Sequence, residues 1–106
     1  MKIFLAQPMN GKTDERIRKE RENAVTCLKR LFHGEDIEIL DTLFDCDAHP
    51  LVYLGKGIEI MADADIVCFM DGWDMARGCI IEHEVALRYG KKIKYLDIRG
   101  WLNESK

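Results

Sequence analysis

An acidic side chain among apolar neighbours has the clearest chemical potential in this sequence. Glu82 follows Ile80 and Ile81 in the segment GCIIEHEVALRYG, where the spacing of apolar residues predicts a helix. Gly78, Glu82 and Ala86 are four residues apart and therefore share one helical face. A carboxylate at the edge of an apolar pocket can be tuned by desolvation to act as a base or a nucleophile. The alternative interpretation is a surface charge.

The loop before this helix carries further groups that could line a site. Asp71, Gly72, Trp73 and Asp74 directly follow an apolar segment that predicts a buried strand. Trp73 offers a flat surface that could stack on a base or a sugar, or could simply pack on a neighbouring helix or a second subunit. Gly78 permits close backbone approach at the positive end of the helix, although it could equally be a structural glycine.

A second loop follows the first predicted strand. It contains Gln7, Pro8, Met9, Asn10 and Gly11, and the Asn-Gly pair indicates a chain reversal. Neither the Walker motif GxxxxGK[ST] nor the dinucleotide motif GxGxxG is present in it. A smaller ligand, of nucleoside or nucleotide size, is therefore the more natural expectation.

Composition limits the remaining possibilities. A chain of 106 residues suits one domain, and its net charge of −3 argues weakly against nucleic-acid binding. No apolar segment reaches the roughly 20 residues that cross a bilayer. The four cysteines form no CxxC pair, and the three histidines lack ligand-like spacing, which predicts a cytoplasmic protein without a metal or another cofactor.

The elements that would position these groups alternate along the chain. Strands are predicted at residues 2–6, 37–40, 65–70 and 93–96, and helices at 13–32, 51–62 and 76–89, with a polar loop at 41–50 that contains Asp45 and Asp47. This alternation predicts one α/β domain over residues 1–106, a four-stranded parallel sheet of order 2-1-3-4 with helices on both faces. Loops 7–12 and 71–78 would face the point where the strand order reverses, a common ligand position. Residues 100–106 are expected to be a short tail anchored by Trp101.

Three segments in matching order, KIFLAQPMNGKTD, ADIVCFMDGWDMARG and GCIIEHEVALRYGKK, resemble the nucleoside 2-deoxyribosyltransferase-like superfamily. They are most similar to its small members, whose first loop reads GPM-x-G. The most specific part of the resemblance is Gly78, Glu82, Ala86 and Gly90.

The resemblance implies a flavodoxin-like three-layer fold, a homo-oligomer (a dimer or higher) and cleavage of an N-glycosidic bond in a nucleoside or nucleotide. Glu82 would attack the anomeric carbon and hold the sugar as a covalent ester, after which a second base gives transfer or water gives hydrolysis.

The sequence also departs from the family pattern. Ala76 stands where nucleotide-hydrolysing relatives carry a phosphate-contacting serine, and Gly57 where many relatives carry a catalytic aspartate. Gln7 replaces a usual glycine. Asp71 or Asp74 could substitute for the missing acid. These departures leave two alternatives open: a nonenzymatic module that binds a nucleotide-like ligand, and a small interaction protein without a ligand.

Overall fold

The computed structural model describes residues 1–40, 42 and 49–104, and it shows an α/β fold. The predicted loop residues Asp45 and Asp47 lie outside this described part. In chain order the elements are β1 (Lys2–Ala6), α1 (Asp14–Leu31), β2 (Glu38–Ile39), α2 (Pro50–Met61), β3 (Ile66–Met70), the short 3-10 helix η1 (Trp73–Met75), α3 (Arg77–Arg88), β4 (Lys92–Leu96) and β5 (Leu102–Asn103).

The four strands predicted from the sequence are parallel and follow the predicted order β2-β1-β3-β4. β1 pairs with β3 from Ile3, opposite Ile66, to Ala6, opposite Phe69. β3 is buried along its whole length, as expected for a central parallel strand covered on both faces. The carboxyl ends of β1 and β3 therefore form the edge where the sequence predicts a ligand.

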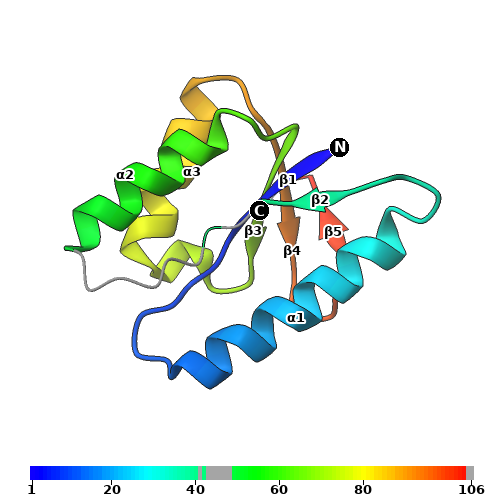
Figure 1. The fold of residues 1–106 in the computed structure, drawn as a ribbon, viewed down its shortest axis with the longest axis horizontal. Helices are drawn as coiled ribbons and strands as arrows, with labels where there is room; N and C mark the ends of the chain where they lie inside the picture. The colour runs from blue at the N-terminus through cyan, green and yellow to red at the C-terminus, as the bar shows by residue number, and fades with distance from the viewer. Residues whose placement is uncertain (41, 43–48, 105–106) are drawn as a thin grey trace.

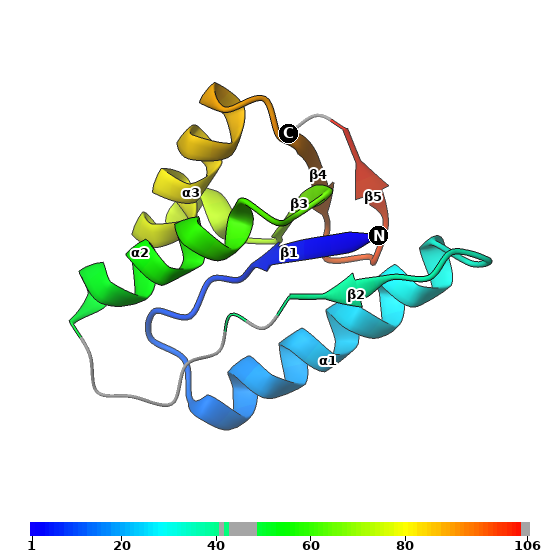
Figure 2. The same ribbon diagram turned by 45° about the horizontal axis from the view of Figure 1, so that its top comes forward.

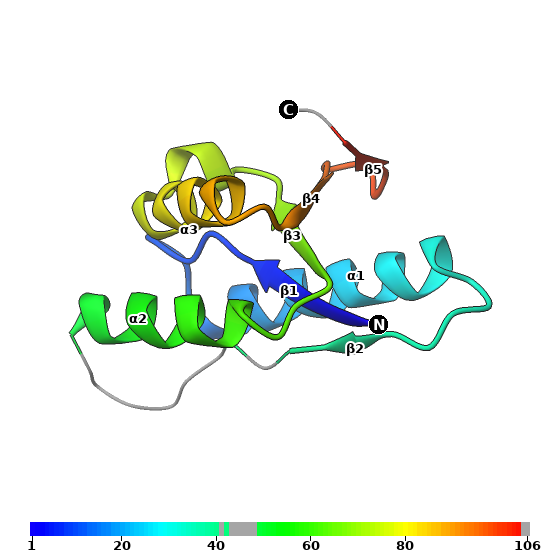
Figure 3. The same cartoon turned by 90° about the horizontal axis from the view of Figure 1, so that it is seen from above.

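The prediction of a purely parallel four-stranded sheet is wrong at one edge, because β5 pairs antiparallel with β4. Figure 3 shows β5 and β2 at opposite ends of the sheet. A tight turn makes the reversal possible. The Asp97 carboxylate accepts hydrogen bonds from the backbone N–H groups of Arg99 and Trp101, and Gly100 adopts a φ of +85°. The sheet is therefore mixed, with the order β2-β1-β3-β4-β5.

The segment that carries β5 is held differently from the prediction. Trp101, the expected anchor, is 60% exposed, whereas Leu102 packs against the core beneath α1. Lys94 of β4 also forms an ion pair with Glu104, just beyond β5. One apolar residue and one exposed ion pair stabilise β5 only slightly, so its position depends on the geometry of the turn before it.

Helices cover both faces of the sheet, as predicted. Figure 1 and Figure 2 show α2 and α3 side by side on one face and α1 on the other. Alternate residues of β1 point to opposite faces, so Phe4 and Ala6 join the core under α2 and α3, while Ile3 and Leu5 join the core under α1. This alternation decides which side chains of the first loop can face Glu82.

The helices begin in different ways. Thr13 caps α1 by accepting a hydrogen bond from the Arg16 backbone N–H at 3.2 Å. His49 caps α2 by accepting from the Leu51 N–H. α3 begins after Ala76 with no side-chain cap. The first N–H groups of α3 therefore receive no hydrogen-bond acceptor from a capping side chain, and they lie at the carboxyl edge of the sheet.

Candidate functional site

Glu82 points from α3 toward α2 and is half-buried between the two helices. Gly57 is the residue of α2 that faces it. A Cβ added at Gly57 would lie 2.8 Å from Glu82 Oε2 and 3.7 Å from Phe4 Cζ. The carboxylate therefore occupies the space that any side chain at Gly57 would need, directly above β1.

The electrostatic state of Glu82 follows from this position. Burial between the helices raises its pKa from 4.5 to about 7. Near neutral pH the protonated and ionised forms are thus present in similar amounts. A carboxyl group in this range can supply either a nucleophile or a hydrogen-bond donor after a small change in pH.

Cys79 is the titratable group that interacts electrostatically both with Glu82 and with Lys12. Burial raises the pKa of the Cys79 thiol to about 12, the negative charge of Glu82 raises it further, and Lys12 lowers it. Cys79 is therefore an un-ionised packing residue. The same interactions show that Lys12, from the first loop, lies near the beginning of α3.

Lys12 is held in place by α1. Its Nζ pairs with Glu20 Oε2 at 3.0 Å, and Arg16 Nε pairs with the other oxygen of the same carboxylate at 3.0 Å. The hydrogen bond from Lys12 is the main reason that the pKa of Glu20 is lowered. A restrained ammonium group thus lies near the uncapped end of α3, which favours an anionic group there.

The first and third loops meet, as the strand order predicts. A Cβ at Gly72 would lie 3.7 Å from Pro8 Cγ. Gly11 takes a φ of +77°, and the Lys12 N–H donates to the Met9 carbonyl at 3.2 Å, which closes the predicted chain reversal. Pro8 is buried, whereas Met9 and Asn10 are exposed at the tip.

Gln7 points away from Glu82. It follows Ala6 and therefore faces α1, where its Nε2 donates to the Ile17 carbonyl at 2.7 Å. Only 6% of Gln7 is exposed, and within the described residues its Oε1 is buried without a hydrogen-bond partner. Side chains along β1 alternate between the two faces of the sheet, and this alternation in the sequence could have shown that Gln7 faces α1 and not α2 and α3.

Trp73 is buried inside its own chain. Its ring stacks on His83 with centroids 4.3 Å apart, and Phe69 and Tyr95 lie 5.2 and 5.7 Å away. His83 Nε2 and Tyr95 Oη are 2.6 Å apart in a hydrogen bond. In this structure Trp73 therefore packs against His83 of α3. His83 and Tyr95 did not stand out in the sequence; the neighbouring Glu82 was the only available signal for His83.

Asp71 and Asp74 are brought together on the β4 side of the third loop. They line a groove of about 190 Å³ with Tyr95 and Asp97, and Glu82 is not part of its lining. The structure thus joins the two candidate acids to each other rather than to Glu82. The remaining lining residues of this groove are Phe69, Gly72, Trp73, Leu96 and Asn103.

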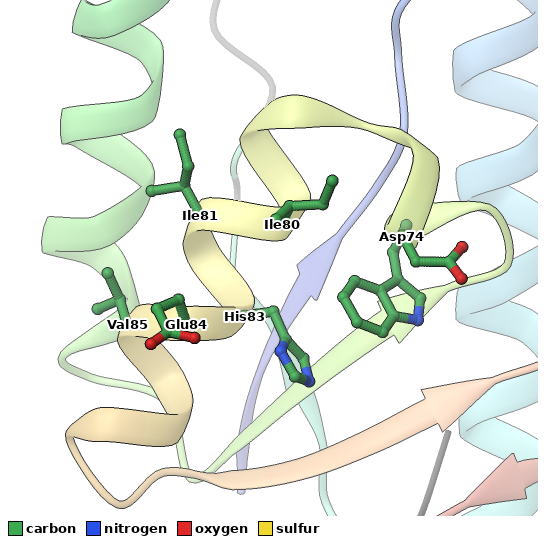
Figure 4. Close-up of a pocket in the computed structure, with 7 residues that line it drawn as sticks. Asp74, Ile80, Ile81, His83, Glu84 and Val85 are labelled. Carbon is green, nitrogen blue, oxygen red and sulfur yellow. The ribbon is translucent and has the colours of Figure 1, made fainter.

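A larger groove, of about 630 Å³, follows the outer side of α3 (Figure 4). Ile80, Ile81 and Val85 give it an apolar wall, with His83 and Asp74 beside them in the figure. The exposed Glu84 pairs with Arg88 on the same side. This groove is separate from the α2–α3 contact that buries Glu82.

Residues 1–95 match the family described as a domain of unknown function, DUF4406. The chain belongs to this family. The match covers Glu82, Gly57 and both loops and ends within β4, so that the β5 strand of this DUF4406 chain lies beyond it. No curated protein and no solved structure matches this DUF4406 chain.

Two further findings concern only the part of the chain that the structure describes. No helix there has both the length and the apolar character that crossing a membrane requires. No group of three or more His, Cys, Asp or Glu side chains in residues 1–40, 42 and 49–104 is arranged to hold a metal ion.

Proposed function

We propose that this DUF4406 protein cleaves or transfers the N-glycosidic bond of a nucleoside or nucleotide, with Glu82 as the nucleophile. The observation that carries the proposal is the Glu82 carboxyl group, which is desolvated between α2 and α3 and has a pKa of about 7. The resemblance to the nucleoside 2-deoxyribosyltransferase-like superfamily supports the same residue. An ordinary surface glutamate would need neither the burial nor the facing glycine.

The proposed reaction has two displacement steps. The ionised Glu82 carboxylate attacks the anomeric carbon, and the carbon–nitrogen bond breaks with its electron pair moving to the base, which takes up a proton. The sugar is then held as a glutamyl ester. Water or a second base attacks the same carbon, which releases the sugar or a new nucleoside and restores the carboxylate.

Other groups are proposed for binding and proton transfer. Asp71 and Asp74 are the candidate acids, and reaching the Glu82 side would require a movement of the third loop. Lys12 near the start of α3 supports a 5′-phosphorylated substrate, because both the ammonium group and the helix end attract an anion. The proposed lining comprises Pro8, Met9, Asn10, Gly11, Gly72 and Gly78. Gln7, which faces α1, and Trp73, which stacks on His83, would join this lining only after a movement of their loops.

The proposal also covers the assembly of the protein and its compartment. Cys27, Cys68 and Cys79 are free thiols, which supports a reducing cytoplasmic environment. A homo-oligomer is proposed because the resembling superfamily oligomerises.

Base release tests the proposed reaction directly. The purified protein is incubated with a panel of nucleosides and 5′-nucleotides, and free base is measured by chromatography. Glu82→Gln should abolish release because the amide cannot attack the sugar. Glu84→Gln is the matched control, since Glu84 lies on the same helix but is exposed. Full activity of the Glu82→Gln protein, or no release from any compound, would overturn the proposal.

A nonenzymatic binding module is the second candidate function. The observation that favours it is the lack of polar side chains at Gly57 and Ala76, which leaves Glu82 without the helpers of the resembling enzymes. Calorimetry on the same panel should then show binding, and the ligand should be recovered intact after long incubation. Any turnover would rule this second function out.

A further inference from the structure

The outer face of α3 is more apolar than a solvated helix surface should be. Ile80 and Ile81 are 46% and 39% exposed, and Leu87 near the end of the helix is also exposed. The inner face is already filled, because Cys79 and Ala86 are buried against the sheet. Solvent-facing positions of an amphipathic helix are normally polar, so these exposed residues indicate a surface that another molecule covers.

Charged residues run between the two isoleucines along the same face. At 100° per residue, Arg77, Glu84 and Arg88 fall between the directions of Ile80 and Ile81 on the helix circumference. Arg77 and Glu84 lie on opposite sides of the isoleucine pair, each about 5 Å along the axis from its midpoint, at 1.5 Å per residue. The face thus has opposite charges placed symmetrically about an apolar centre.

We propose that this face is the interface of a symmetric dimer, in which α3 packs antiparallel against α3 of a second copy. The twofold axis would pass between Ile80 and Ile81. Ile80 then lies opposite the partner subunit's Ile81, and Arg77 lies opposite the partner subunit's Glu84 at both ends of the contact. Every contact occurs twice, as a closed twofold interface requires.

The charge pattern selects a second copy in this orientation. A parallel pair of α3 helices would place Arg77 against the partner's Arg77 and Glu84 against the partner's Glu84, which is repulsive. The antiparallel pair replaces both repulsions with attractions. Ile80, Ile81 and Val85 border the groove of about 630 Å³, so apolar side chains of the second copy can pack into this groove. The proposal does not depend on the proposed glycosidic reaction, because Glu82 points to the opposite side of α3.

Molar mass in solution, measured by light scattering and by sedimentation, tests the interface at protein concentrations up to about 100 μM, since interfaces of ordinary size have Kd values from micromolar downwards. The wild-type protein should be a dimer. Ile80→Lys should weaken dimerisation at least about 100-fold, because the two copies would bury two ammonium groups at the centre. Ile98→Lys is the matched control, since Ile98 is an exposed isoleucine in the β4–β5 turn. It should remain dimeric.

Charge exchange tests the orientation. Arg77→Glu should weaken the dimer about tenfold by facing the partner's Glu84, and the combined Arg77→Glu and Glu84→Arg protein should recover it. Circular dichroism confirms that each variant is folded. A monomeric wild-type protein at every concentration, a dimer that survives Ile80→Lys, or a charge exchange that restores nothing would overturn the proposal.

Discussion

Replacing Glu82 with glutamine should stabilise the fold at alkaline pH. The amide has the shape of the carboxyl group but carries no charge at any pH, so it avoids the cost of an ionised group between α2 and α3. Burial raises the pKa of Glu82 from 4.5 to about 7. At 1.36 kcal/mol for each pH unit, this rise corresponds to about 3 kcal/mol of folding free energy.

The sign of the pH dependence follows from proton binding. Because the pKa is higher in the folded state, the folded protein holds more protons than the unfolded chain between pH 4.5 and about 7. The contribution of Glu82 to stability is therefore fully present below pH 4.5 and is lost as the pH rises through about 7. Other groups titrate alike in both proteins, so the difference between wild type and variant isolates Glu82.

Urea denaturation at a series of pH values measures this difference. The free energy of unfolding of Glu82→Gln minus that of the wild type should rise by about 3 kcal/mol between about pH 4.5 and pH 8. Glu59→Gln is the control, because Glu59 is an exposed glutamate of α2, and it should change stability by no more than about 0.5 kcal/mol. A difference between wild type and Glu82→Gln that stays constant with pH would refute the assigned burial.

Two pairs of glycine substitutions test the local geometry. Gly57→Ala should push the flexible Glu82 carboxylate toward solvent, so its pKa falls and the pH dependence of unfolding weakens, although the helix gains about 1 kcal/mol in propensity. Gly55→Ala, with nothing within 4 Å of the added Cβ, should give the same gain and leave the pH dependence intact. Gly100→Ala should cost about 3 kcal/mol in thermal denaturation, because its φ is +85° and its Cβ would lie 2.9 Å from Cys27 Sγ. Gly34→Ala, at a φ of +89° with open space around it, should cost only about 1 kcal/mol, and equal losses at both positions would contradict the role of the Cys27 contact.

The parallel part of the fold could be predicted because its signals are local. β3 is a continuous apolar segment, and alternating strands and helices leave few topologies. β5 could not be predicted in this way, because a strand of two residues is too short to show the alternation of apolar and polar side chains that indicates a strand. Its existence depends on Asp97, which must accept hydrogen bonds from two backbone groups, and on Gly100 taking a positive φ. The formation of this short hairpin is thus determined by the residues of its turn and not by those of its strand.

The site was only partly predictable for a different reason. The spacing of Gly78, Glu82 and Ala86 predicts that they share one face of α3, and in the structure Ala86 is buried and Glu82 is half-buried. The spacing says nothing about α2, so the contact with Gly57 required the packed structure. Trp73 shows the same limit, because its stacking on His83 depends on the path of the loop between β3 and α3.

The raised pKa of Glu82 also separates the two candidate functions. A nucleophile must be ionised, so base release should increase as the pH rises through about 7. A binding group that donates a hydrogen bond must be protonated, so ligand affinity should decrease over the same interval. Glu82→Gln would abolish release in the first case and preserve binding in the second, since an amide still donates. Because Gly57 has no side chain, no acid at that position of α2 shares the proton, and the midpoint of either profile reports on Glu82 itself.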